Sequence, residues 1–132
     1  MTRDEYVTYR MNRAKQSLQV AERVLQDGFI EDAINRIYYA IYYAISALLY
    51  TRKLHPKTHL GMKALFSKEF VKNNLITDKQ AQIYSTIFAK RFEADYEDFF
   101  TIDMDTVQNH LKEATNFILL IETIINNSPQ ND

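Results

Sequence analysis

The chain has 132 residues, 46% of them hydrophobic, with two glycines, two prolines and no cysteine. This length suffices for one compact domain with a real core, so we expect residues 1–132 to form a single domain. The scarcity of turn-forming residues argues against an all-β fold and favours long helices. The net charge of −1, from 16 basic and 17 acidic residues, does not by itself indicate a nucleic-acid or membrane partner.

The composition also bears on location and on metal binding. Without cysteine there can be no disulfide framework and no thiolate metal site, which fits a reducing cytoplasm. The first residues are charged and lack the apolar core of a signal peptide. The longest uncharged and mostly apolar run, residues 37–50, is shorter than the roughly 20 residues that span a bilayer. We therefore expect a cytoplasmic protein with no membrane contact.

The first helix is predicted to start after Thr2 and to stop at Gly28. Thr2 and Glu5 have the spacing of a capping box, in which side-chain and backbone groups satisfy each other at a helix start. Gly28 can supply the left-handed residue that ends a helix. Between them, apolar residues recur at steps of three and four, as one helical face requires: Val7, Met11, Ala14, Leu18, Ala21 and Leu25.

The second helix is predicted over about residues 29–53 and ends before Pro56, since residues that precede proline avoid the helical conformation. It carries two apolar faces. One consists of Ile34, Ile37, Ile41, Ile45 and Leu48, and the other of Arg36, Ala40, Tyr43 and Ala47. A helix that is apolar nearly all round is buried on several sides. We therefore expect it to be central, with its second face contacting another chain, a ligand or both.

Three further helices complete the prediction. A shorter one should cover about residues 58–72 and bury Leu60, Leu65, Phe66 and Phe70. Thr77 and Gln80 form a second capping box, which opens a helix with Ala81, Tyr84, Ile87, Phe88 and Arg91 on one face. Residues 95–103 are predicted as a connection, and the last helix covers about residues 104–126 with Val107, Leu111, Ala114, Ile118, Ile121 and Ile125 inward. The chain from about residue 127 should fray. Short connections make sequence neighbours antiparallel, so we expect an all-α, up-down bundle of four long helices and one shorter helix.

Arg91 is the strongest single candidate for a functional residue. By helical spacing it shares a face with Tyr84 and Phe88, and Asp95 follows one turn later. In one interpretation, Arg91 and Asp95 form an ion pair within one helix, worth about 0.2–0.5 kcal/mol. In the other, Asp95 orients Arg91 in a cleft, where its planar fork binds a phosphate.

Arg36 lies in an otherwise uncharged turn beside Tyr39 and Tyr43, where burial without partners would be costly. Either it pairs with an acidic residue of another helix or extends along the surface, or it contributes to a ligand site. The tyrosines of the same helix are at positions 38, 39, 42, 43 and 50. Most should pack with one hydroxyl hydrogen bond each, and the alternative is that some stack on nucleic-acid bases.

The three histidines do not indicate a metal site. His55 and His59 are interrupted by Pro56, and His110 is distant in sequence, so no two have the spacing of metal ligands on one helix. His59, at a predicted helix start, either caps that helix or binds an anion together with free backbone N–H groups. No glycine-rich phosphate loop, dinucleotide fingerprint or nucleophile-elbow motif occurs, so no cofactor is expected.

Three segments carry a resemblance to a known family. They are A-x-R-V-L-x-D-G-F (21–29) leading to N-R-I-Y-Y-A-I-Y-Y-A (35–44), then K-T-H-L-G (57–61) followed by Phe66 and Phe70, then R-F-E-A-D-Y (91–96). In this order, over about residues 5–125, the chain resembles the HEPN domains, small helical bundles named for nucleotide binding in higher eukaryotes and prokaryotes. It is most similar to their stand-alone bacterial and archaeal branch.

The resemblance implies a bundle that forms a homodimer. In many members the dimer cleft holds an arginine, four to six further residues and a histidine, and this pair cuts RNA without metal. Such members act as toxins, and their partner is often a small nucleotidyltransferase that serves as antitoxin. By resemblance, Arg36 and His59 join Arg91, Asp95 and Tyr96 around one cleft, and Tyr39 and Tyr43 stand beside Arg36.

The chain departs from the cleaving pattern at one position. Arg91 matches the arginine, but Tyr96 stands where the histidine is expected. Metal-free RNA cleavage needs a group that exchanges protons near neutral pH, and tyrosine, with a pKa of about 10, does so poorly. We therefore predict a nucleotide- or RNA-phosphate-binding and partner module, one half of a toxin–antitoxin or nucleotidyltransferase pair, with little or no ribonuclease activity. The alternatives are a metal-independent ribonuclease toxin that uses Arg91 with Tyr96 or His59, and a purely structural dimeric subunit.

Overall fold

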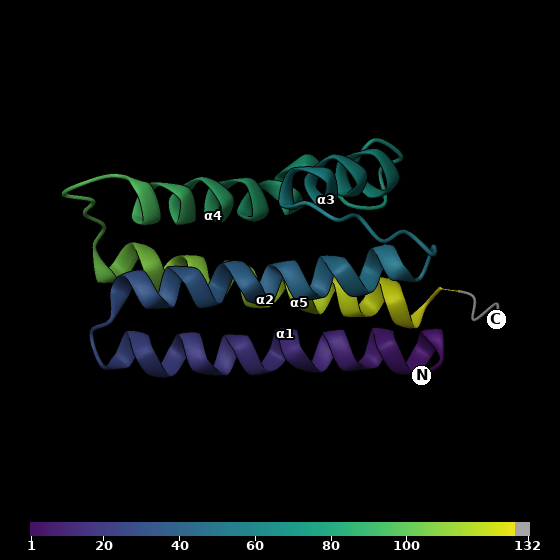
Figure 1. Ribbon diagram of the computed structural model, residues 1–132, viewed down its shortest axis with the longest axis horizontal. Helices are drawn as coiled ribbons and strands as arrows, with labels where there is room; N and C mark the ends of the chain where they lie inside the picture. Colours follow the sequence, from purple (N-terminus) through teal and green to yellow (C-terminus); the bar gives the residue numbers. More distant parts are fainter. Residues whose placement is uncertain (129–132) are drawn as a thin grey trace.

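The computed structural model describes residues 1–128 and is an all-α bundle, as predicted (Figure 1). Its elements are α1 (Arg3–Gln26), α2 (Ile30–Tyr50), α3 (His59–Phe66), the π-helical turn η1 (Ser67–Val71), α4 (Asp78–Tyr96) and α5 (Met104–Asn126). The four long helices α1, α2, α4 and α5 alternate in direction along the chain, which confirms the up-down arrangement. The predicted fraying from about residue 127 concerns mainly residues that lie outside the described part.

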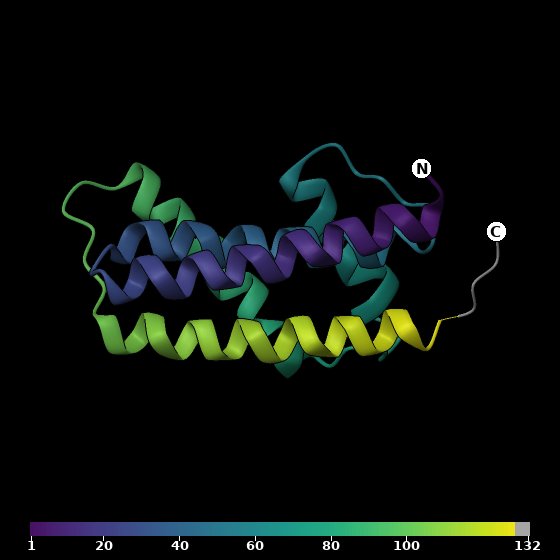
Figure 2. The same ribbon diagram turned by 90° about the horizontal axis from the view of Figure 1, so that it is seen from below.

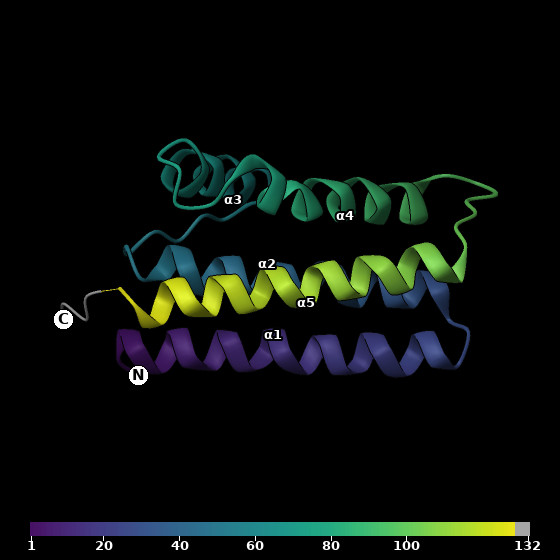
Figure 3. The same cartoon turned by 180° about the vertical axis from the view of Figure 1, so that it is seen from behind.

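The helices form three levels around α2. Figures 1 and 3, which view the bundle from opposite sides, both show α1 on one side of α2 and α5, and α3 with α4 on the other. Figure 2, seen from below, separates α5 from the α1–α2 pair. Helix α2 packs against α1, α3, α4 and α5. It is therefore the central helix that its apolar faces predicted.

The predicted helix ends are present at Thr2, Gly28 and Thr77. The Thr2 side chain accepts a hydrogen bond from the Glu5 backbone N–H, which is one half of the expected capping box. Gly28 has a φ of +88°, in the left-handed region, and the Gly28 and Phe29 N–H groups bond back to the last turn of α1 as in a Schellman motif. At the start of α4 both capping-box bonds form between Thr77 and Gln80, at 2.9 and 3.0 Å.

The second face of α2 differs from the expectation. Ala40 and Ala47 are fully buried within the single chain, so the prediction that this face meets another chain or a ligand is wrong for them. Helix α1, the main packing partner of α2, contributes its own fully buried Ala14 and Ala21 to the same core. Small residues on both helices permit a close approach, and the Ser17 hydroxyl donates to the Arg36 carbonyl at 2.8 Å. One chain therefore covers the first apolar face and the two alanines of the second, whereas Arg36 and Tyr43 stay exposed or half-buried.

The region predicted as one helix over 58–72 is divided. Helix α3 ends at Phe66 and continues as η1, in which the Lys72 N–H bonds to the Ser67 carbonyl. Phe66 and Phe70 are buried as predicted, but Leu60 is 71% exposed and Met62 is buried in its place. The reason is that His59 packs against α2, so that His59, Met62 and Phe66 form the inward face and Leu60 points away.

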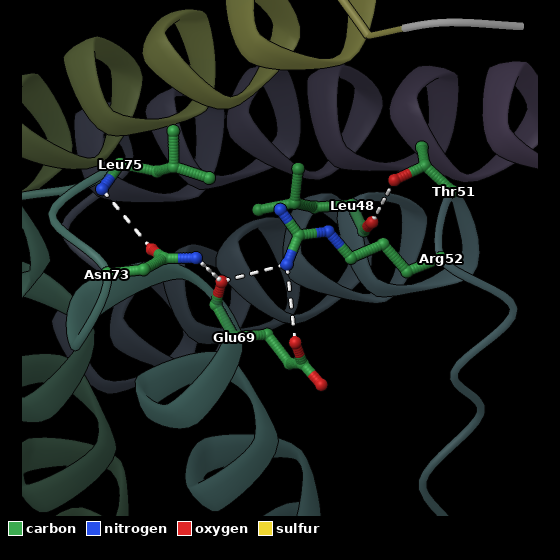
Figure 4. A network of polar contacts seen from close by, with 6 residues as sticks. All are labelled: Leu48, Thr51, Arg52, Glu69, Asn73 and Leu75. Carbon is green, nitrogen blue, oxygen red and sulfur yellow. Dashed lines mark hydrogen bonds and ion pairs between the residues drawn. The ribbon is translucent and has the colours of Figure 1, made fainter.

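A polar network fixes η1 to the end of α2 (Figure 4). The Arg52 guanidinium donates to the carbonyl of Glu69 at 2.9 Å and to its carboxylate at 3.2 Å, and it lies 4.3 Å from the centroid of the Phe70 ring. The Asn73 amide donates to the same Glu69 carbonyl at 2.6 Å and accepts from the Leu75 N–H at 3.3 Å. The Glu69 carbonyl therefore has two side-chain donors. These contacts add to the backbone bonds from the Asn74 N–H to the Val71 carbonyl and from the Ile76 N–H to the Phe70 carbonyl in the turn between η1 and α4.

Candidate functional site

The site is built on the exposed side of α2, where tyrosines form a cluster. Tyr38 is buried, whereas Tyr39, Tyr42 and Tyr43 are half-buried. Neighbouring rings contact one another, with Tyr38 and Tyr39 centroids 5.4 Å apart and Tyr39 and Tyr43 centroids 6.2 Å apart. Because tyrosines occur in pairs one helical turn apart, their rings cover a continuous strip of the helix.

Arg91 of α4 lies over this strip. Its guanidinium carbon is 4.6 Å from the Tyr38 ring centroid and 5.3 Å from that of Tyr39, within the range of cation–π attraction. One Arg91 nitrogen donates to the Tyr39 hydroxyl at 3.4 Å. The Arg91 Nε is 3.7 Å from Asp95 Oδ2, so the expected ion pair is present. That separation is too long for a hydrogen bond, and the buried Nε has no acceptor within residues 1–128.

His59, the first residue of α3, completes the cluster from the other side of Tyr38. Its Nδ1 is hydrogen-bonded to the Tyr38 hydroxyl, and its ring centroid is 5.2 Å from that of Tyr42. Burial, and secondarily the Arg91 charge, lowers the pKa of His59 below its ordinary value. Burial raises the pKa of Tyr38 to about 12, although the Arg91 charge opposes this. At pH 7 Tyr38 therefore keeps its phenolic proton and His59 is neutral.

Lys63 adds positive charge one turn after His59. Its ammonium nitrogen lies 5.0 Å from the centroid of the Phe88 ring, which in turn is 6.0 Å from Tyr38. The cluster contains two positive side chains, Arg91 and Lys63, and one carboxylate, Asp95, which pairs with Arg91. This excess of positive charge suits the cluster to an anion. In the described residues no group of His, Asp and Glu could hold a metal ion. No helix in this part of the chain has the length and apolarity needed to cross a bilayer.

The candidate residues fall into two sets. Arg91, Asp95, Tyr39, Tyr43 and His59 are joined through the tyrosine cluster. By contrast, Arg36 is exposed, and no ion pair or hydrogen bond of its side chain to residues 1–128 is present. Tyr96 is 75% exposed and packs on Phe92, with centroids 4.8 Å apart, instead of on Arg91.

Two members of the cluster were not recognised from the sequence as site residues. Tyr38 links Arg91 to His59, and Lys63 brings a second charge. The spacing of His59 and Lys63, four residues apart at the start of one helix, was an available signal for the latter. For Tyr38 there was no such signal, because Tyr39, three residues after Arg36, shares the face of Arg36 and Tyr38 does not.

Comparisons with known proteins identify the family to which the chain belongs. The family model described as "HEPN domain" matches residues 7–124, and the chain therefore belongs to the HEPN domain family. A protein of Thermotoga maritima named "UPF0332 protein" is 31% identical over 123 residues, which cover 93% of each chain. A protein of Methanocaldococcus jannaschii named "Putative toxin MJ0142" is 33% identical over 87 residues, which cover 66% of this chain and 59% of that protein.

Proposed function

We propose that this HEPN-family protein binds the phosphate of a nucleotide or of RNA at Arg91. The observation that carries the proposal is the guanidinium itself, whose five N–H donors make one long hydrogen bond within residues 1–128 and whose side chain is 27% exposed. A phosphate oxygen at the exposed part of this side chain would accept charge-assisted hydrogen bonds from the remaining N–H groups. The Lys63 ammonium would attract the same anion, and Tyr39 offers a ring on which a base can stack.

We further propose that the protein acts as one half of a two-component pair. Support comes from the relatives of Methanocaldococcus jannaschii whose printed names contain the word toxin. The partner suggested by the family resemblance is a small nucleotidyltransferase that serves as antitoxin. Co-purification of the native protein, with the bound proteins and nucleic acid identified, tests this part directly.

The protein is also proposed to form a homodimer. The end of α4 and the following turn carry three exposed aromatic residues, Phe92 at 58%, Tyr96 at 75% and Phe99 at 98%. Exposed apolar patches favour association, and two-fold pairs are the commonest oligomers. Because Phe92 follows Arg91 directly, such an interface would place the phosphate site at its edge.

Metal-independent RNA cleavage is the second candidate function, and one observation favours it: His59 is close enough to Arg91 for the Arg91 charge to lower its pKa. Against it, the His59 Nδ1 is already hydrogen-bonded to the Tyr38 hydroxyl. With Nδ1 held in this bond, only the Nε2 of His59 is left to exchange a proton with a substrate. We therefore expect binding with weak or absent cleavage.

Calorimetric titration with uridine monophosphate tests the phosphate site. Arg91→Ala should weaken binding by about tenfold or more, the usual effect of losing a charge-assisted contact of 1.5–3 kcal/mol. Lys79→Ala is the matched control, because it removes one exposed positive charge from the start of the same helix. Equal affinities for the two variants would reject Arg91 as the phosphate ligand. In parallel, single-stranded RNA incubated with chelator should remain intact.

A further inference from the structure

A second pair of cationic side chains lies on α1 beside the same tyrosine strip. Arg13 donates to the Tyr43 hydroxyl at 2.9 Å, and its guanidinium carbon is 5.0 Å from the Tyr43 ring centroid. Arg10 lies 5.5 Å from the same ring and 5.2 Å from that of Tyr6, whose hydroxyl accepts from the Arg10 Nε at 2.9 Å. Tyr43 is thus flanked by two arginines from α1, just as Tyr39 is flanked by Arg91 from α4.

These contacts form one continuous row across the surface of α2. From Arg13 the row passes over Tyr43 to Tyr39, whose ring centroids are 6.2 Å apart, and from Tyr39 to Arg91 at 5.3 Å. Two half-buried aromatic rings therefore separate two guanidinium groups. A single phosphate cannot contact both ends of such a row.

The α1 arginines keep their charge free for a ligand. Some basic residues have carboxylate partners, for example Lys15 with Glu122 and Arg52 with Glu69. Arg10 and Arg13 contact tyrosine hydroxyls and rings instead, and no carboxylate within residues 1–128 forms an ion pair with either. In a chain of net charge −1, positive charge is thus concentrated at this strip.

We propose that the row Arg13–Tyr43–Tyr39–Arg91 is a binding track for single-stranded nucleic acid, longer than one nucleotide. Arg91 and Arg13, supported by Arg10, hold successive backbone phosphates, and the two tyrosine rings between them stack on bases. Cationic groups along a backbone with aromatic rings for the bases are the usual means of binding single strands. The inference rests on the proposed phosphate site at Arg91 and extends it to a second anchor on α1.

A second copy of this chain is a less suitable binding partner for the row than a polyanion. A two-fold interface pairs the same surface patch of both subunits. Arginines without carboxylate partners on one subunit would therefore lie opposite the same arginines of the other. Like charges opposed across an interface cost several kcal/mol. A polyanion, in contrast, gains from each of these groups through release of counterions.

Fluorescence anisotropy with labelled octauridylate and octathymidylate tests the track, and the two probes distinguish RNA from DNA as its source. We expect the octamers to bind more tightly than uridine monophosphate. Arg13→Ala should weaken octamer binding about tenfold, as expected for one charge-assisted contact of about 1.5 kcal/mol. It should also reduce the slope of log affinity against log salt by about 0.7. Binding of uridine monophosphate at Arg91 should not change.

Arg23→Ala is the matched control, since it removes an exposed arginine of the same helix, about 15 Å along its axis from Arg13. If Arg13→Ala affects octamer binding no more than Arg23→Ala while uridine monophosphate still binds at Arg91, the track is rejected and the phosphate site stands. If neither octamers nor uridine monophosphate bind, both are rejected. If Arg13→Ala alters the mass measured by light scattering and not octamer affinity, the row is a protein interface and the track is likewise overturned.

Discussion

The Tyr38 hydroxyl and the Nδ1 of His59 share a hydrogen bond that joins the centre of α2 to the first residue of α3. Arg91 lies over the same Tyr38 ring, at 4.6 Å. One buried phenol thus connects a neutral imidazole and a guanidinium that approach it from different helices. The protonation of His59 is set by this arrangement, because burial and the Arg91 charge both disfavour the imidazolium.

The stability of the protein should therefore depend on pH through His59. Its folded pKa lies below the unfolded value of about 6.5, so in that range the unfolded chain binds more protons than the folded one. Stability contributed by neutral His59 is complete above pH 6.5 and is lost as the pH falls toward the folded pKa. In urea unfolding, the free energy of unfolding should fall less between pH 7 and pH 5.5 for His59→Gln than for the unmodified protein. The other two histidines are common to both proteins, and equal losses would contradict the prediction.

Enlarging the small-residue face of α2 should destabilise the fold. Ala40 is fully buried within the chain, so Ala40→Leu must displace neighbouring atoms, which typically costs about 1–3 kcal/mol. Ala89→Leu adds the same volume at an exposed position of α4 and should change the free energy of unfolding by less than about 0.5 kcal/mol. Urea unfolding followed by helical circular dichroism compares the two. A similar effect in both variants would mean that this face tolerates extra volume.

The Arg52 network should contribute measurably to stability. Arg52→Ala removes the donor of two bonds to Glu69 and the contact with Phe70, which should cost about 1 kcal/mol at this partly exposed site. Lys68→Ala, an exposed charge on η1, is the control and should be close to neutral. Denaturant midpoints at low and high salt should also show that the difference shrinks as salt screens the ion pair. A midpoint unchanged by Arg52→Ala would show that Asn73 alone holds the turn.

The sequence was sufficient to predict the four long helices because each carries its own local signals. The Thr77–Gln80 capping box, Gly28 and the apolar stripes are patterns within one element. The features that were predicted wrongly or missed depend on packing between helices. Leu60 fits a helical stripe, but the contact of His59 with Tyr38 turns it outward. The joining of Arg91, Tyr38 and His59 likewise involves three helices, and no spacing along the chain encodes it.

The oligomeric state should respond to the aromatic end of α4. Phe92→Glu places a charge in the exposed Phe92–Tyr96 pair, and in a dimer interface a buried unpaired charge is strongly unfavourable. Light scattering should then report the monomer mass of 15.6 kDa for the variant and twice that mass for the unmodified protein. Leu119→Glu introduces the same charge at an exposed apolar position of α5 and should leave the dimer intact. A monomer in all three samples would reject the interface.

Helix α2 is the packing partner of α1, α3, α4 and α5, and this shared position bears on how the protein opens. If any one of these helices detaches, part of the apolar surface of α2 becomes exposed to water. The helices that remain packed cannot cover that surface. The bundle should therefore unfold as a single cooperative unit. Amide protons in the middle of α2 should exchange with solvent only through that global event, at a rate that reports the full free energy of unfolding. Those of the short π-helical turn η1, whose residues other than Phe70 are partly or fully exposed, should exchange sooner.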